Sequence, residues 1–242
     1  MAALLELDHV AKAFGTVVVA DELSYTLAAG EILGVVGPNG AGKTSMLNLI
    51  TGSLQPDRGR ILLDGRDITA MPVHARARAG IGRTHQVPHP FGGMTVFENV
   101  LIGASFAGQR TGGDPRTATV AALERTGLLA HANTPAGALT LLDRKRLELA
   151  RALASGPRLL LLDEIAGGLA EHEVQALIEI IRALRGEGLG IVWIEHIVQA
   201  LVSVVDRLMA TNYGRKLAEG APKTVMASPE VQSVYLGQGI RA

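Results

Sequence analysis

Cysteine is absent from the 242 residues of this chain. A chain without cysteine can form no disulfide framework and can perform no thiol chemistry, so those two classes of protein are excluded. The sequence also lacks an excess of charge of either sign, because 23 Lys and Arg residues balance 23 Asp and Glu residues. No basic block stands out, and nucleic-acid binding is therefore not indicated.

Long apolar runs are missing as well. No stretch approaches the roughly 18 consecutive apolar residues that a membrane-spanning helix requires, and residues 1–8 lack the charged and apolar regions of a signal peptide. If the protein works at a membrane, we expect it to do so through a partner. Hydrophobic residues still make up 48% of the chain, enough for the core of one large domain or of a domain with a subdomain.

A phosphate-binding motif, G-x-x-x-x-G-K-[ST], is present over residues 37–44. Its glycines allow backbone N–H groups to converge on an anion, and the helix expected from Ser45 adds its positive end. Lys43 can follow the β- and γ-phosphates, while the Thr44 hydroxyl suits Mg²⁺. An apolar strand expected at 31–36 gives the motif a context that a chance Gly-rich turn lacks. The residues expected to bind the nucleotide here are Gly37, Asn39, Gly40, Gly42, Lys43, Thr44 and Ser45.

The hydrophobic pattern around this motif predicts an α/β fold. Alternating strands and helices in the second half of the chain indicate a parallel sheet, whereas the region before the motif is rich in short strands. Between them, residues 95–155 are predicted to be helical, with breaks at 112–115 and 135–137. Strands are expected at 4–7, 17–19, 23–27, 60–63, 159–162, 190–194 and 207–211, helices at 73–79, 171–185, 197–203 and 222–236, and turns at 28–30, 64–65 and 212–218. Residues 81–86 are expected to run out of a strand into the Pro-rich segment 87–93.

Two predicted strands end in side chains suited to catalysis. The strand at 159–162 is followed by Asp163, which suits a position beside Mg²⁺, and by Glu164, which suits a general base for water. The strand at 190–194 leads into His196, which can donate to a γ-phosphate. Gln86, after the strand that begins at Ile81, can hydrogen-bond water or Mg²⁺. Taken singly, a charged turn, a surface His and a lone Gln would each be ordinary features. Their presence in the same chain as the phosphate loop favours a role in nucleotide chemistry.

These residues together resemble the ATP-binding cassette (ABC) ATPases, the nucleotide-hydrolysing subunits of ABC transporters. The resemblance covers essentially the whole chain, and the order of its motifs is more specific than any one of them. It implies ATP and Mg²⁺ as cofactors, with catalytic roles for Gln86, Glu164 and His196. Thr44, Gln86 and Asp163 would contact the metal. Phe14 would stack on adenine, although a core or surface Phe is an equally good interpretation.

The same resemblance implies the P-loop NTPase fold of ABC ATPases, with an N-terminal antiparallel β subdomain and an inserted helical subdomain. The whole chain, 1–242, would form a single ABC ATPase domain. Its core would comprise about residues 1–86 and 156–242, and the helical subdomain about residues 87–155.

Several segments point to one branch of this family. Residues 80–86, 94–100, 218–222 and 229–237 look like those of branched-chain amino-acid importer ATPases. The ATPase of lipopolysaccharide export shares much of this, including a segment like 72–78, and the tail at 218–222 and 229–237 does not separate the two, so it stays an alternative. The segments 80–86 and 94–100 favour the importer branch. A soluble ABC protein without a transporter is a third possibility, but the neutral charge and single cassette argue against it.

The importer interpretation implies a set of partners and a location. A second ABC ATPase subunit would complete the ATP sites as a homodimer or heterodimer. Two membrane permease subunits would bind the pair, and a periplasmic or extracellular binding protein would act indirectly. The chain would then lie at the cytoplasmic face of the inner membrane.

The sequence departs from the family in the signature segment, which closes the partner's ATP site. The family has Leu-Ser-Gly-Gly-Gln, whereas residues 139–143 are Leu-Thr-Leu-Leu-Asp. Thr140 keeps a hydroxyl, Leu141 and Leu142 replace both glycines, and Asp143 places a negative charge near phosphate. Thr140 and Asp143 also have the spacing of a helix capping box.

A second departure is Ala170, where the family has Asp or Asn. That polar residue communicates across the dimer in the family. Both departures favour an asymmetric pair with a different partner ATPase, because this chain keeps its own ATP site but offers an altered signature.

Overall fold

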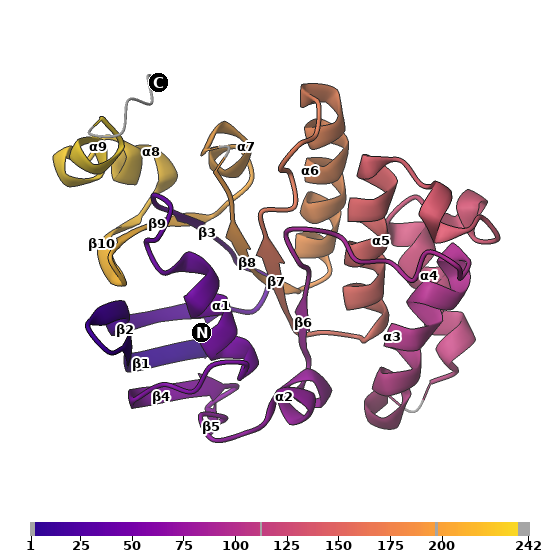
Figure 1. Cartoon of the computed structure of the whole chain (residues 1–242), viewed down its shortest axis with the longest axis horizontal. Helices are drawn as coiled ribbons and strands as arrows, with labels where there is room; N and C mark the ends of the chain where they lie inside the picture. Colours follow the sequence, from indigo (N-terminus) through magenta and orange to yellow (C-terminus); the bar gives the residue numbers. More distant parts are fainter. Residues whose placement is uncertain (1–2, 112, 197, 237–242) are drawn as a thin grey trace.

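Two sheets form the framework of the computed structural model, which describes residues 3–111, 113–196 and 198–236 (Figure 1). One is a four-stranded antiparallel sheet in the order β2-β1-β4-β5, and the other has six strands in the order β10-β9-β3-β8-β7-β6. In the larger sheet β10 is antiparallel to β9, and the neighbouring pairs from β9 to β6 are parallel. The strands are β1 (Ala3–Phe14), β2 (Val17–Ala28), β3 (Ile32–Val36), β4 (Arg58–Leu63), β5 (Arg66–Asp67), β6 (Ile81–Arg83), β7 (Leu159–Asp163), β8 (Gly190–Ile194), β9 (Arg207–Asn212) and β10 (Arg215–Gly220).

The central parallel strands bring three loops to one edge of the sheet. All residues of β3, β7 and β8 are buried, as expected where both faces of a parallel sheet are covered. Ile194 at the end of β8 is in register with Val35 of β3 and with Asp163 of β7. The carboxyl ends of the three strands therefore lie at the same level, and the segments that follow them share one edge.

The N-terminal strands are longer than the sequence predicted. The segments 17–19 and 23–27, expected as separate strands, form the single strand β2, and β1 extends well beyond 4–7. Glu22 on β2 and His9 on β1 adopt the left-handed conformation, with φ of 51° and 49°, and the β1–β2 register shifts on either side of them. These bulges interrupt the alternation of apolar residues, which explains why the pattern indicated shorter strands.

The helices lie on the faces of the larger sheet and at one end of the molecule, where α3, α4 and α5 pack together (Figure 1). The break predicted at 135–137 is present, but the helix predicted on either side of it is wrong for residues 126–134 and 138–140, because the whole stretch 126–140 consists of turns, irregular segments and two short 3₁₀ helices. The C-terminal helix predicted at 222–236 is divided into α8 and α9. The helices are α1 (Lys43–Thr51), α2 (Val73–Ala79), α3 (Val96–Thr111), α4 (Pro115–Arg125), η1 (Leu129–His131), η2 (Ala136–Ala138), α5 (Leu141–Ala154), α6 (Glu171–Gly186), α7 (Val198–Val202), α8 (Pro222–Met226) and α9 (Pro229–Leu236).

The other predicted turns and elements are found close to their expected positions. Asp64 and Gly65, with φ of 51° and 74°, form the tight turn between β4 and β5, and Tyr213 with Gly214 connects β9 to β10. Ile197, the first residue of the helix predicted at 197–203, lies outside the described residues. Within the parts of the chain that the structure describes, no helix is both long and apolar enough to cross a bilayer.

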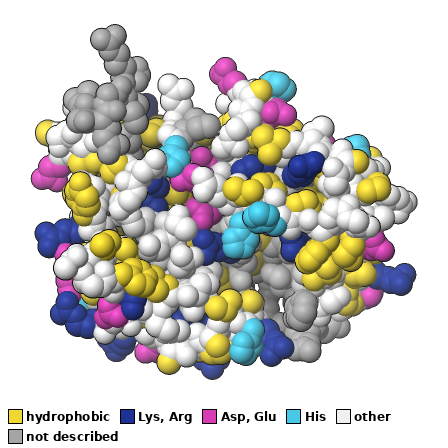
Figure 2. Space-filling model, viewed as in Figure 1, with side chains coloured by type: hydrophobic (Ala, Val, Ile, Leu, Met, Phe, Trp, Pro, Cys, Tyr) yellow, Lys and Arg dark blue, Asp and Glu magenta, His cyan; other side chains and the backbone are white. Residues whose placement is uncertain are grey.

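The surface carries both signs of charge. On the face seen in Figure 2, Lys and Arg side chains are interspersed with Asp and Glu side chains. This agrees with the equal numbers of basic and acidic residues in the sequence.

Candidate active site

The phosphate loop connects β3 to α1 and is closed by its own lysine. The Nζ atom of Lys43 donates to the carbonyl oxygens of Gly37 at 2.7 Å and Pro38 at 3.0 Å. Burial lowers the pKa of this ammonium, and the carboxylates of Glu164 and Asp163 oppose that shift. The ammonium is therefore held in the loop, within the field of both predicted acids.

Two glycines of the loop are required by their surroundings. A Cβ atom on Gly42 would lie 2.3 Å from the carbonyl oxygen of Val19, and one on Gly37 would lie 2.3 Å from the carbonyl oxygen of Thr211. Gly42 also has a φ of 91°, a conformation that residues with a side chain rarely adopt. Strands β2 and β9 thus hold the loop at distances that only glycine permits.

Asp163 is fixed on one side and unpaired on the other. Its Oδ2 atom accepts a hydrogen bond from Arg83 at 2.9 Å, and Arg83 also donates to Oδ1 of Asn48 on α1 at 2.6 Å. The Oδ1 atom of Asp163 is buried and has no hydrogen-bond partner among the described residues. A buried unpaired oxygen is costly, and a cation bound at this atom would remove that cost.

This arrangement fits Mg²⁺. The ion takes oxygen ligands and commonly uses one or two protein groups, with water and substrate phosphates completing the shell. It therefore does not need a cluster of three acidic or His side chains, and the described residues contain no such cluster. Asp163 and the exposed hydroxyl of Thr44 would hold the ion, which would neutralise phosphate charge.

Glu164 lies between the two other predicted catalytic residues. Its Oε2 atom accepts a hydrogen bond from Nε2 of Gln86 at 2.6 Å, and its Oε1 atom lies 2.5 Å from Nε2 of His196. The carboxylate is nearly buried, at 9% exposure for the residue, whereas His196 is exposed. The structure thus brings together three side chains that lie 78 and 32 positions apart in sequence.

The backbone at Glu164 is held in a strained conformation. Its φ is 48°, which costs free energy in a residue with a side chain. Its N–H donates to the carbonyl oxygen of Ile194 at 2.9 Å, and its own carbonyl oxygen accepts from Gly167 at 3.3 Å. These bonds to the ends of β8 and to the following turn keep the carboxylate at the edge of the sheet.

The signature segment makes its contacts at the start of α5. Thr140 is the N-cap: its hydroxyl accepts a hydrogen bond from the N–H of Asp143 at 3.2 Å and donates to Oδ2 of Asp143 at 2.9 Å. Leu141 is 44% exposed, and its side chain lies over Gly168, where a Cβ would be 3.3 Å from it. Leu142 is partly buried. Thr140 is therefore confirmed as the N-cap of α5, while the Asp143 side chain bonds the Thr140 hydroxyl instead of its N–H as a capping box would require.

Phe14 lies at the end of β1, opposite Val17 of β2. Its side chain is 55% exposed, and Nζ of Lys12 is 5.4 Å from the ring centroid. An exposed ring is able to stack on a base, and β2 continues from this hairpin to Val19 beside Gly42. Phe14 thus contacts Lys12 and pairs with Val17 within the β1–β2 hairpin.

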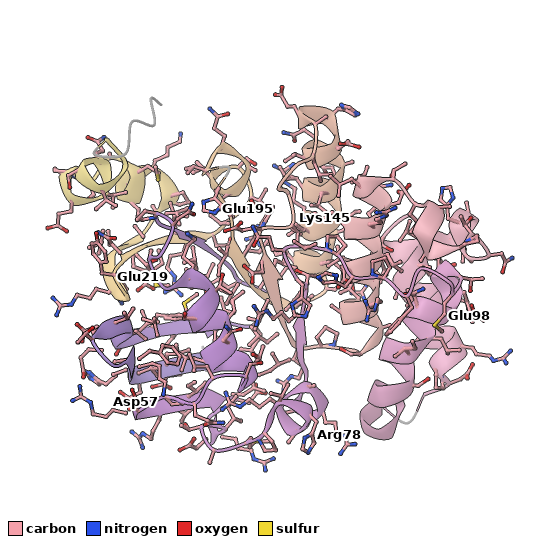
Figure 3. The ribbon with its side chains drawn as sticks, viewed as in Figure 1. Asp57, Arg78, Glu98, Lys145, Glu195 and Glu219 are labelled. Atoms are coloured by element: carbon pink, nitrogen blue, oxygen red, sulfur yellow. The ribbon has the colours of Figure 1, made fainter. Side chains whose placement is uncertain are left out.

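Sequence reasoning missed two basic residues of the site, Arg83 and Lys145. Arg83 is the last residue of β6 and reaches Asp163, whereas Lys145 on α5 reaches the main chain of Gln86 and Glu164. Figure 3 shows Lys145 on the side of the sheet where Glu195 follows β8. A signal existed for Lys145: it precedes the buried Leu149 by four residues, so both lie on the same helical face.

Comparison with known proteins identifies the family. Residues 20–167 match the family described as ABC transporter, and residues 215–240 match the family described as branched-chain amino acid ATP-binding cassette transporter. The chain belongs to the ABC transporter family, and it is an ATP-binding subunit that hydrolyses ATP to drive transport. The predicted P-loop ABC ATPase fold is confirmed.

Individual relatives and solved structures agree with this family. The chain is 36% identical to the high-affinity branched-chain amino acid transport ATP-binding protein of Escherichia coli, covering 97% of this chain and 98% of the relative. It is also 36% identical to a lipopolysaccharide export system ATP-binding protein of Acidithiobacillus ferridurans, covering 98% of each. A solved ATP-binding cassette of an ABC transporter in its ADP conformation superposes with a TM-score of 0.90, at 29% identity, covering 98% of this chain and 100% of that chain.

Proposed function

We propose that this ATPase powers the uptake of branched-chain or related amino acids through separate permease subunits. The supporting observation is the match of residues 215–240 to the branched-chain family. The described part of this segment forms β10, α8 and α9, and β10 pairs with β9 of the main sheet. The permease subunits would receive substrate from a periplasmic or extracellular binding protein.

Purification of a tagged chain from membranes tests this proposal. We expect two permease subunits to co-purify and the uptake of radiolabelled leucine to fall when the gene is deleted. Co-purification with lipopolysaccharide-export subunits and unchanged amino-acid uptake would instead support the second candidate. That candidate is kept because export ATPases resemble the chain as closely as importer ATPases do.

We infer the following roles from the geometry of the site. Glu164 acts as the general base for the attacking water, oriented by Gln86 and His196. Lys43 and the remaining nucleotide-binding residues of the loop contact the phosphates, and Phe14 stacks on the adenine. Asp163, Thr44 and Gln86 take part in Mg²⁺ binding.

The variant Glu164→Gln tests these roles. It keeps the shape of the side chain but removes the base, so ATP hydrolysis should fall by a factor of about 10² or more while binding of a fluorescent ATP analogue is retained. Glu171→Gln, in the first turn of α6, is the matched control and should keep full activity. Hydrolysis by Glu164→Gln at the wild-type rate would contradict the role of the base.

We further propose that the chain works with a different ATPase subunit rather than with a second copy. Glycines in a signature allow backbone to approach phosphate closely, whereas Leu141 and Leu142 add bulk and Asp143 adds a negative charge. The ATP site of this chain would be completed by the partner's signature. The site that this chain completes in return would be the weaker of the two.

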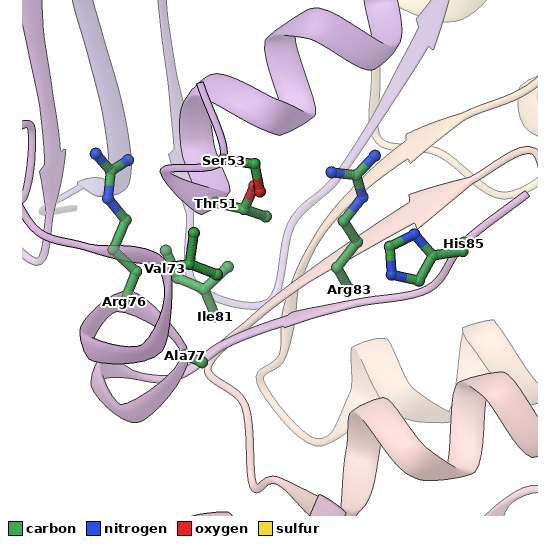
Figure 4. A pocket seen from close by; sticks show the side chains of 8 residues that line it. All are labelled: Thr51, Ser53, Val73, Arg76, Ala77, Ile81, Arg83 and His85. Carbon is green, nitrogen blue, oxygen red and sulfur yellow. The ribbon is translucent and has the colours of Figure 1, made fainter. Parts of the chain in front are cut away.

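A pocket beside the active site is our candidate for the permease contact. It has a volume of about 200 Å³ and lies between α1, α2 and β6 (Figure 4). Arg83 lines the pocket and also donates a hydrogen bond to Asp163. This one side chain therefore connects the pocket to the proposed metal site. Val87 and Phe91, which follow Gln86, are 59% and 48% exposed. The lining residues are Thr51, Ser53, Val73, Arg76, Ala77, Ile81, Arg83 and His85.

This contact would place the chain at the cytoplasmic face of the inner membrane. We propose that it works there as a single ABC ATPase domain, with residues of about 87–155 as the helical subdomain. The permease would then touch the boundary between that subdomain and the core.

A further inference from the structure

A buried lysine bonds the main chain of two residues of the hydrolysis site. Lys145 is 4% exposed. Its Nζ atom donates to the carbonyl oxygen of Gln86 at 2.6 Å and to the carbonyl oxygen of Glu164 at 3.3 Å. The side chains of these two residues also meet, with 2.6 Å between Nε2 and Oε2. One ammonium therefore spans the backbone of a pair whose side chains are already in contact.

The ammonium is placed among carboxylates. Burial lowers the pKa of Lys145, and the carboxylates of Glu195, Glu164 and Glu148 act in the opposite direction. Glu195 also supports the segment after the base, because its Oε1 atom accepts a hydrogen bond from the N–H of Ala166 at 2.7 Å. The desolvation of a buried ammonium is costly. The hydrogen bonds of Lys145 to the carbonyl oxygens of Gln86 and Glu164 compensate for that cost.

Lys145 belongs to the helix that carries the signature. Helix α5 begins at Leu141, directly after the cap residue Thr140. Gln86 precedes the helical part of the chain, and Glu164 follows β7 in the sheet. The ammonium thus connects three segments that are distant in sequence, and a shift of α5 would pull on the strained backbone of Glu164.

We propose that Lys145 is a positioning residue for ATP hydrolysis, which keeps Gln86 and Glu164 in register and transmits movements of helix α5 to the carboxylate. This inference rests on the role of Glu164 as the base. The lysine acts through the main chain of its two partners and does not touch the reacting atoms. Its removal should therefore slow the chemical step and leave nucleotide binding nearly unchanged.

The variant Lys145→Met, studied in the complex purified through a tagged chain, tests the proposal. Methionine retains an unbranched apolar side chain but loses the charge and the donors. Misplacement of a catalytic group by about 1 Å can cost a factor of about 10² in rate, so we expect kcat to fall by a factor of about 10 to 100. KM for ATP and the affinity for a fluorescent ATP analogue should stay close to those of the wild type. Lys145→Arg, which keeps the charge and several donors, should recover much of the rate.

Lys216→Met is the matched control. Lys216 also donates to a main-chain carbonyl, that of Ser24 at 2.7 Å, but it lies on β10. Its removal should leave kcat unchanged. If Lys145→Met does not fold, as judged by its melting temperature, Lys145→Gln replaces it and should show the same selective loss of kcat.

Several outcomes would overturn the proposal. A folded Lys145→Met or Lys145→Gln variant with wild-type kcat would do so, as would equal losses of kcat and nucleotide affinity. A loss that Lys145→Arg does not relieve at all would also contradict it. Glu164→Gln separates the two ideas, because activity in that variant would refute the role of the base, whereas an inactive Glu164→Gln beside a fully active Lys145→Met would refute only the role of the lysine.

Discussion

His85, which lines the pocket between α1, α2 and β6, illustrates how one side chain can make stability depend on pH. Burial and the neighbouring Arg83 guanidinium lower the pKa of His85 below the ordinary value of a histidine. For a group whose pKa is lowered on folding, the stabilising contribution is present above the unfolded pKa. It is lost as pH falls through the folded pKa, because protonation is then more favourable in the unfolded chain.

We therefore expect part of the acid destabilisation of this protein to come from His85. Melting temperatures measured from pH 8 down to about pH 5 should fall less steeply for His85→Asn than for the wild type, since the unfolded imidazole titrates near pH 6.5. His172→Asn, at the exposed start of α6, is the control and should leave the slope unchanged. Parallel curves for His85→Asn and wild type would show that this imidazole does not contribute.

At this scale the sequence predicted the acidic and polar residues of the site better than the basic ones. Asp163, Glu164 and His196 could be found because each follows an apolar run that ends a strand. Arg83 ends the three-residue strand β6, which is too short to form a long apolar run, and Lys145 lies in a run of three basic residues, where charge alone does not show which side chain is buried. The four-residue spacing from Lys145 to Leu149 was a local signal, but the burial itself depends on the packing of α5 against the sheet.

Among the elements, the phosphate loop is held by two strands, β2 and β9, that are not adjacent to it in sequence. Gly42 and Gly40 both have positive φ, 91° and 80°, but they differ in their surroundings. A Cβ on Gly42 would meet the carbonyl oxygen of Val19 at 2.3 Å, whereas a Cβ on Gly40 would meet no atom within 4 Å among the described residues.

Gly42→Ala should therefore destabilise the protein more than Gly40→Ala. In Gly40→Ala only the left-handed conformation is penalised, by about 1–2 kcal/mol. Gly42→Ala adds a clash with the backbone of β2, which requires the loop or the strand to move. Chemical denaturation of the two variants without nucleotide gives the comparison. Equal losses of stability would mean that β2 does not hold the loop.

The altered signature segment, residues 139–143, leads to a prediction about the ATPase activity of the isolated chain. If Leu141 and Leu142 obstruct the ATP site of a second copy, the isolated chain should have low ATPase activity. The double change Leu141→Gly and Leu142→Gly should raise it severalfold, even though glycine in a helix costs about 1 kcal/mol per residue. Steady-state ATPase assays on the isolated chain measure this effect.

The double alanine variant at the same two positions is the control for bulk. Alanine keeps a Cβ and should raise the activity less than glycine does. Full activity of the isolated wild-type chain would contradict the proposal that Leu141 and Leu142 obstruct the ATP site of a second copy. It would also remove the argument for a different partner subunit.

Element boundaries were predicted well where one period dominated and poorly where it was broken. The buried strands β3, β7 and β8 are continuous apolar runs and were found almost to the residue. Strands β1 and β2 each contain a residue in the left-handed conformation, His9 and Glu22, which interrupts the alternation of apolar side chains. The alternation therefore predicted shorter strands. Residues 126–134 contain apolar residues that were read as part of a helix, and Leu128 among them is buried, although the only helix there is the short 3₁₀ helix η1.

For the whole molecule, the order of motifs along the chain predicted the architecture, because the phosphate loop, the Asp163–Glu164 pair and His196 each lie at or closely after the end of a strand in the parallel part of the sheet. What it could not predict is the register that brings Val35, Ile194 and Asp163 to one level. That alignment is decided by pairing between strands that are far apart in sequence, and it is what brings Lys43, Glu164 and His196 to the same edge.

The proposed permease contact involves exposed apolar side chains close to the pocket between α1, α2 and β6. Phe91 is 48% exposed and stacks with Arg151, whose guanidinium is 5.2 Å from the ring centroid. Phe91→Glu places a charge where an apolar contact is expected and would require its desolvation on docking. Co-purification of the permease subunits with this variant should therefore fall strongly, while its melting temperature and ATP affinity stay near those of the wild type.

Leu129→Glu, at a similarly exposed position of 41% in η1, should retain the permease. Retention by both variants would place the docking surface elsewhere, and loss by both would indicate that any added charge weakens the complex.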